Sequence, residues 1–117
     1  MNATYTLLRK IGMKSTYAGY PYFAYGISLT VHNGDYSRNI TKGLYTDIGV
    51  QYGVSNSCVE AALRTLIRNY WNQYDDSLLS PLLGYPLYER PTASEFISIL
   101  ADFLRDNPEP FLSLIHI

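Results

Sequence analysis

Apolar side chains recur at three- and four-residue steps along most of this chain, the spacing that places them on one side of an α-helix. The longest such stripe lies in residues 59–74, and shorter ones lie in residues 3–12, 20–31 and 96–104. Glycine, proline and asparagine residues between the stripes are typical of turns. Only the short apolar tail, residues 111–117, could form a β-strand. With two shorter helical stretches included, the pattern predicts an all-α domain of six helices.

Residues 44–70 are predicted to form a helix-turn-helix, in which a short helix, a tight turn and the longest helix follow one another. Gly49 is small at a point where two helices must nearly touch, and Gly53 permits the positive φ that such a turn usually requires. Val54 can fill the angle between the helices. In DNA-binding proteins with this motif the second helix lies in the major groove. An ordinary helical corner inside a core would have the same spacing.

The second helix of this motif carries its own start signal and an inner face. Ser55 can cap it, or Ser57 can do so together with Glu60 three residues later. Cys58 and Leu63 are expected on the inner face. A thiol near a helix N-terminus could be redox-sensitive, but a half-buried packing role is the stronger interpretation of Cys58.

Start and stop signals also delimit the other helices. Thr41 can cap the first helix of the motif, and Asp75 with Asp76 can cap a short helix over residues 77–83. Pro81 is expected to kink or end that short helix, because proline interrupts helical hydrogen bonding. A threonine and a glutamate at the ends of residues 92–95 form the capping-box pattern before the last helix.

Composition narrows the class of protein. At 117 residues, with 47% hydrophobic and 16% charged side chains, the chain fits one globular domain. No apolar run approaches the roughly 20 residues of a membrane span, and no signal peptide is evident. The single cysteine excludes an intramolecular disulfide and suits a reducing compartment, so a cytoplasmic protein without membrane contact is expected.

Charge is distributed unevenly although the net charge is only −1. Residues 1–70 hold seven basic and three acidic side chains, whereas residues 71–117 hold two basic and seven acidic ones. The predicted helix-turn-helix lies in the basic part. This asymmetry is compatible with one face that meets DNA, and scattered surface charge could produce it too.

No residue pattern indicates catalysis or a cofactor. His32 and His116 are far apart in the sequence and have no acidic or cysteine ligand pattern around them. No Ser-His-Asp arrangement, phosphate-binding glycine loop or paired carboxylates appear. We therefore expect neither an enzyme nor a metal or cofactor site.

Several strings carry a family resemblance that covers roughly residues 5–105. They are Ile-Thr-Lys-Gly-Leu-Tyr-Thr-Asp-Ile at residues 40–48, Gly-Tyr at residues 84–85 and Pro-Thr-Ala-Ser-Glu-Phe-Ile at residues 91–97. With them, the chain resembles the C-terminal effector domain of the stage-zero sporulation response regulator. The resemblance implies a helical domain that binds a short DNA box as tandem copies and contacts an RNA polymerase sigma factor.

The resemblance also implies which side chains read DNA. Glu60 and Arg64 match family positions that take part in reading bases, whereas Cys58 and Ala61 stand where the family carries arginine. These two departures predict a different target, weaker binding or none. The region from Asp75 to the glycine at position 84 matches a segment that meets a sigma factor, and Pro81 is foreign to it. The family's regulator has a receiver domain in front of the effector, so a stand-alone effector is expected here.

The sequence therefore predicts a DNA-binding transcriptional regulator with a single helical domain over residues 1–107 and an apolar tail, 108–117, outside the family match. The candidate DNA-binding residues are Asn56, Ser57, Glu60, Arg64, Thr65, Arg68 and Lys42. The partners would be double-stranded DNA, a sigma factor and a second copy of the chain. The alternative is a degenerate helical interaction or dimerisation module that no longer reads DNA. Twelve tyrosines, a net charge near zero and the apolar tail favour that alternative.

Overall fold

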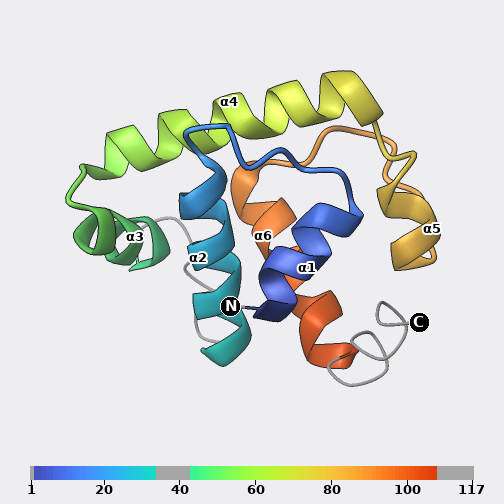
Figure 1. Ribbon diagram of the computed structural model, residues 1–117, viewed down its shortest axis with the longest axis horizontal. Helices are drawn as coiled ribbons and strands as arrows, with labels where there is room; N and C mark the ends of the chain where they lie inside the picture. Colours follow the sequence, from blue (N-terminus) through green and yellow to red (C-terminus); the bar gives the residue numbers. More distant parts are fainter. Residues whose placement is uncertain (1, 34–42, 108–117) are drawn as a thin grey trace.

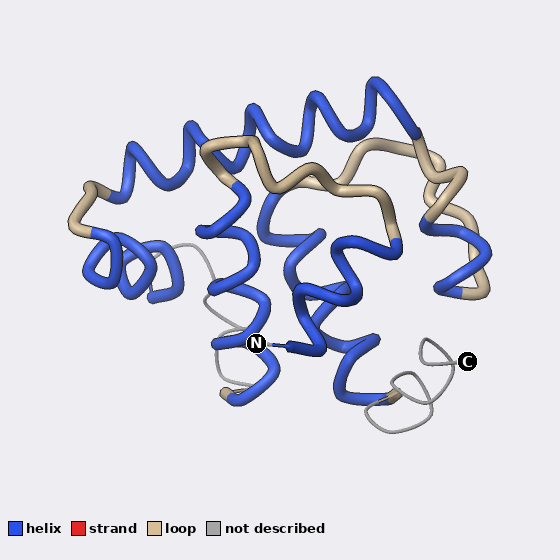
Figure 2. Tube along the Cα trace, in the orientation of Figure 1, coloured by secondary structure: helices blue, strands red, loops and turns tan. Residues whose placement is uncertain are grey.

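The computed structural model describes residues 2–33 and 43–107, and this part of the chain is entirely helices and connecting loops (Figures 1 and 2). The predicted all-α, six-helix fold is confirmed. The cap predicted at Thr41 and the strand suggested in the tail lie outside the described residues. The helices are α1 (Asn2–Lys10), α2 (Tyr20–His32), α3 (Tyr45–Tyr52), α4 (Asn56–Tyr74), α5 (Leu79–Leu83) and α6 (Ala93–Asp106).

The longest helix, α4, lies along one side of the domain, and three helices pack beneath it (Figure 1). α2 and α6 share the largest interface, and both also pack against α4, while α1 packs on α2. α3 lies at the N-terminal end of α4 and α5 near its C-terminal end (Figure 1). One side of α4 is thereby buried and the other faces outward.

Two phenylalanines mark the centre of the core. The rings of Phe23 and Phe96 meet edge to face, with their centroids 5.2 Å apart, and Tyr70 from α4 packs on Phe96 at 5.9 Å. Edge-to-face pairs add to the stabilisation from apolar burial. The apolar stripes predicted from the sequence supply the rest, and the fully buried large side chains include Leu7, Leu8, Ile11, Ile27, Leu44, Ile48, Leu63, Leu66, Leu79 and Ile97.

The helix starts show which capping signals form. Ser55 caps α4, where its Oγ accepts a hydrogen bond from the Cys58 N–H at 3.1 Å. At α6 the capping box is complete, since Thr92 Oγ1 accepts from the Glu95 N–H at 3.2 Å and the Thr92 N–H donates to Glu95 Oε1 at 3.1 Å. These backbone and side-chain hydrogen bonds lower the pKa of Glu95. Ser57 does not cap α4.

The prediction for α5 was wrong in two respects. Asp76 does not cap this helix with its side chain, since its Oδ2 accepts from the Leu87 N–H at 2.9 Å and fixes the loop before α6. Pro81 does not break the helix. It lies in the first turn, where the amide hydrogen that proline lacks would have no intrahelical partner.

Two glycines allow close backbone contacts, one with α4 and one with the turn that precedes it. A Cβ on Gly19, at the start of α2, would lie 2.5 Å from the backbone oxygen of Ala62 in α4. A Cβ on Gly49 would lie 2.5 Å from the backbone oxygen of Val54. Gly53 ends α3 with φ +69, as the sequence predicted for the turn. These contacts fix α4 against α2 and α3.

Tyr70→Phe is expected to lower the free energy of unfolding by about 1–2 kcal/mol, because a buried carbonyl would lose its hydrogen-bond donor. The Tyr70 hydroxyl donates to the Ile11 carbonyl oxygen at 2.6 Å and joins α4 to the end of α1. Urea denaturation of both proteins would measure the loss. Tyr74→Phe is the matched control, since Tyr74 is only partly buried. Equal stability of the wild type and the Tyr70 variant would contradict the expectation.

Candidate nucleic-acid interface

The outward side of α4 is a continuous stripe of exposed side chains. Ser57, Ala61, Arg64 and Arg68 follow one another at steps of three and four residues, and all four are exposed. Because an α-helix has 3.6 residues per turn, these positions lie on one side over three turns. The buried residues Val59, Leu63, Leu66, Ile67 and Tyr70 lie on the opposite side.

The helix-turn-helix presents the first turn of α4 at the surface. Asn56 and Ser57 are both exposed at the start of this helix. The Asn56 side-chain amide donates to Thr46 Oγ1 in α3 at 3.0 Å, so one of its donors is occupied. Recognition helices contact base edges mostly through their N-terminal residues. The geometry therefore suits Asn56 and Ser57 for such contacts.

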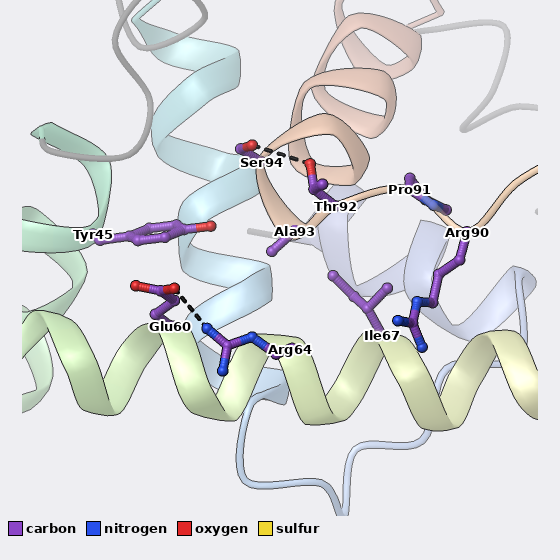
Figure 3. Close-up of a pocket in the computed structure, with 9 residues that line it drawn as sticks. All are labelled: Tyr45, Glu60, Arg64, Ile67, Arg90, Pro91, Thr92, Ala93 and Ser94. Carbon is purple, nitrogen blue, oxygen red and sulfur yellow. Dashed lines mark hydrogen bonds and ion pairs between the residues drawn. The ribbon is translucent and has the colours of Figure 1, made fainter.

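Glu60 and Arg64 form an ion pair across one turn of α4. Arg64 Nη2 donates to Glu60 Oε1 at 2.6 Å (Figure 3). The two side chains keep exposures of 62% for Arg64 and 52% for Glu60, so the guanidinium is reachable from outside. An exposed pair of this spacing contributes only about 0.3–0.5 kcal/mol, and a ligand with a better acceptor can displace the carboxylate.

On one flank of α4, a hollow of about 410 Å³ separates this helix from the start of α6 (Figure 3). Glu60 and Arg64 line it from α4, Tyr45 from α3, and Arg90 from the loop before α6. Burial raises the pKa of the Tyr45 phenol, and the Glu60 carboxylate adds to this effect. Two exposed arginines therefore border one concave surface.

On the other flank of α4, a hollow of about 350 Å³ has a different character. Cys58, Ala61 and Thr65 line it from α4, opposite the loop residues Tyr17 and Gly19. Cys58 is exposed, so its predicted place on the inner face was wrong. It lies near Tyr22, whose pKa is raised by burial and by the Cys58 thiol. Among the described residues, no arginine or lysine lines this hollow.

The predicted DNA-binding residues therefore gather on a single helix, but on two flanks of it. Lys42 lies outside the described residues. Arg90 was not among the predicted residues, because no sequence pattern places the loop before α6 beside α4. A cation directly before the capping box of α6 was the only local signal. The described candidates are Asn56, Ser57, Glu60, Arg64, Thr65 and Arg68.

Residues 4–104 match the sequence model of the family described as sporulation initiation factor Spo0A C terminal. The chain belongs to this family. The match covers most of the chain and confirms the predicted resemblance. Spo0A C-terminal domains are DNA-binding effector domains of transcription regulators in sporulation.

Membership of the Spo0A C-terminal family makes this chain a DNA-binding, all-helical domain of a transcriptional regulator, with double-stranded DNA as a partner. The family is one of transcription factors and not of enzymes. Among the described residues, no helix has both the length and the apolar character that a membrane crossing demands.

Proposed function

We propose that this domain binds a specific sequence of double-stranded DNA by inserting α4 into the major groove. The observation that carries the proposal is the outward stripe of α4, where Arg64 and Arg68 are exposed and no other helix of residues 2–33 and 43–107 covers them. A major groove about 12 Å wide admits one α-helix. α3 and the turn at Gly53 support α4 from behind, as in DNA-binding helix-turn-helix proteins.

Each candidate side chain has a role that its chemistry supports. Arg64 exchanges the Glu60 carboxylate for the O6 and N7 atoms of a guanine, the commonest specific contact between a protein and a base. Glu60, once released, can accept a hydrogen bond from the amino group of a cytosine. Asn56, Ser57 and Thr65 contact further base edges or nearby phosphates, while Arg68 and Lys42 hold the DNA backbone.

Arg90 extends this surface to the start of α6. It lines the same hollow as Arg64 (Figure 3), and Ser94 contributes a hydroxyl there. DNA in contact with α4 would bring its backbone close to this flank. We assign Arg90 to a phosphate contact, which positions the domain without reading sequence.

Selection of bound sequences from random DNA, followed by a salt titration of the selected box, tests the proposal. The logarithm of the affinity should fall linearly with the logarithm of the salt concentration, because the protein releases counterions from each DNA phosphate that it neutralises. Recovery of no sequence, or affinity that ignores salt, would reject DNA reading by α4. Self-association under those same conditions would favour the alternative, a helical interaction module.

Arg90→Gln is expected to weaken binding to the selected box and to random DNA by a similar factor, about three- to tenfold. The slope of log affinity against log salt should fall by about one, because one phosphate contact is lost. Fluorescence anisotropy at several salt concentrations would measure both. Lys10→Gln removes an exposed charge at the end of α1, away from the hollow, and should leave the slope unchanged. A loss confined to the selected box would contradict this role for Arg90.

Further partners follow from the family resemblance. We propose that two copies bind adjacent boxes and that the segment from Asp75 to Gly84, which includes α5, contacts a sigma factor. Leu78, beside α5, is a large apolar side chain with 38% exposure, which supports a protein contact there. Gel-shift stoichiometry and crosslinking to a purified sigma factor would test these contacts. Action without a receiver domain, in the cytoplasm, remains a prediction that the mass and location of the native protein would check.

A further inference from the structure

We propose that the short side chains on the second flank of α4 read the 5-methyl groups of thymine, so that the target box contains a thymine opposite Ala61 or Thr65. The inference rests on the proposed function, since it requires α4 in the major groove. The inference adds a preference for thymine to the guanine contact that is proposed for Arg64.

The first argument is the size of the side chains. Cys58, Ala61 and Thr65 are all short and exposed, and Ala61 lies in the middle of the outward side of α4. The long Glu60 and Arg64 side chains are paired on the opposite flank. The surface formed by Cys58, Ala61 and Thr65 can therefore approach base edges within van der Waals distance, while Arg68 lies one turn beyond Thr65.

The second argument is the chemistry of this flank. Its hollow is lined by Cys58, Ala61, Thr65 and the loop at Tyr17–Gly19, and none of the described lining residues is a cation that could donate two hydrogen bonds to guanine. Methyl groups from alanine and threonine complement the thymine methyl, the one apolar group that a base pair presents in the major groove. A thymine is therefore the base that this surface recognises best.

The third argument is that the position of this flank is fixed. Gly19 lies against the backbone of Ala62, so the loop beside the hollow cannot move inward without a clash, or outward without losing this contact. Ala61 and Thr65 lie one helical turn apart, with about 5–6 Å between their Cβ atoms. This spacing suits one thymine or two neighbouring thymines along the groove.

Deoxyuridine scanning of the selected box tests the inference. Each thymine is replaced in turn by deoxyuridine, which lacks only the methyl group. We expect the affinity to fall about fourfold at one or two positions, which is the effect of removing one buried methyl group. Replacement of the other thymines should leave the affinity unchanged. Binding to the unmodified box reports the proposed function separately.

Variants of the helix assign the effect to its source. Ala61→Gly should bind unmodified DNA more weakly and should no longer distinguish thymine from deoxyuridine at one responsive position. Thr65→Ser, which keeps the hydroxyl, should lose the response at a responsive position without disturbing the fold. Gln73→Gly is the matched control, because it introduces the same glycine at an exposed site near the other end of α4 and should retain the response.

Circular dichroism of each variant would verify that α4 is intact. Tolerance of deoxyuridine at every position overturns the inference and leaves the proposed function standing. A full response in both the Ala61 and Thr65 variants also overturns it. Failure to select any sequence rejects the proposed function, and this inference with it.

Discussion

Arg64→Ala is expected to weaken binding to the selected DNA box by about 10- to 100-fold, the loss of one bidentate contact with a guanine. Arg64 is suited to this contact because its guanidinium is held at the outward edge of α4 by Glu60, at 2.6 Å, and remains exposed. The preference for one base pair of the box should disappear together with the affinity. Competition between boxes that differ at single positions would measure both effects.

Two further variants separate base-specific contacts from non-specific electrostatic attraction to the DNA backbone. Glu60→Gln removes the negative charge and keeps a hydrogen-bonding side chain, so Arg64 is freed and binding to random DNA should become tighter. Arg68→Ala should weaken all sequences alike if Arg68 contacts the backbone. An Arg64 variant that lost affinity equally for random DNA and for the box would assign Arg64 to phosphate contact and contradict the base-reading role.

Gly19→Ala is expected to lower the free energy of unfolding by about 3 kcal/mol, the upper end of the usual cost of overpacking. The added Cβ would lie 2.5 Å from the Ala62 oxygen and 2.9 Å from its carbonyl carbon. Backbone atoms inside α4 cannot move aside as a flexible side chain would. Either α2 shifts away from α4, or α4 loses the hydrogen bond at Ala62. Chemical denaturation monitored by circular dichroism would measure the change.

Gly53→Ala provides the matched control for Gly19→Ala. At Gly53 a new Cβ would meet no atom within 4 Å, so only the positive φ opposes the substitution. The expected loss is about 1–2 kcal/mol, the cost of placing an L-residue in the left-handed region. Equal destabilisation by the two variants would mean that the contact between α2 and α4 tolerates a methyl group, contrary to the geometry.

Sequence reasoning succeeded where a local rule determines the structure. α4 begins at Asn56 because Ser55 caps it, and α6 begins after Thr92 because the capping box with Glu95 satisfies its first amide groups. The apolar stripes identified the buried sides of both helices, since burial and helical periodicity act together. The outward position of Arg64 and Arg68 follows from the same periodicity.

Sequence reasoning failed where a tertiary contact determines the position or the partner of a side chain. Cys58 looked like a core residue because it is small and apolar, yet the rotation of α4 set by its longer apolar neighbours leaves it exposed. The Asp76 carboxylate does not cap α5 as expected, because it accepts a hydrogen bond from the backbone N–H of Leu87, eleven residues away. The place of Arg90 beside Arg64 depends on how α6 docks under α4, and no short-range pattern encodes that docking.

If α4 reads DNA as proposed, the Glu60 carboxylate would also limit how long the domain stays at wrong sites on a chromosome. Because Glu60 already pairs with the Arg64 guanidinium at 2.6 Å, a passing phosphate must displace this carboxylate and gains less than it would from an unpaired arginine. At the target box the exchange is compensated, because a guanine edge accepts two hydrogen bonds from Arg64 while the released Glu60 accepts one from a cytosine amino group. A genome presents about 10⁶–10⁹ competing non-specific sites, so a short stay at each of them would reduce the time that the domain needs to find its target boxes.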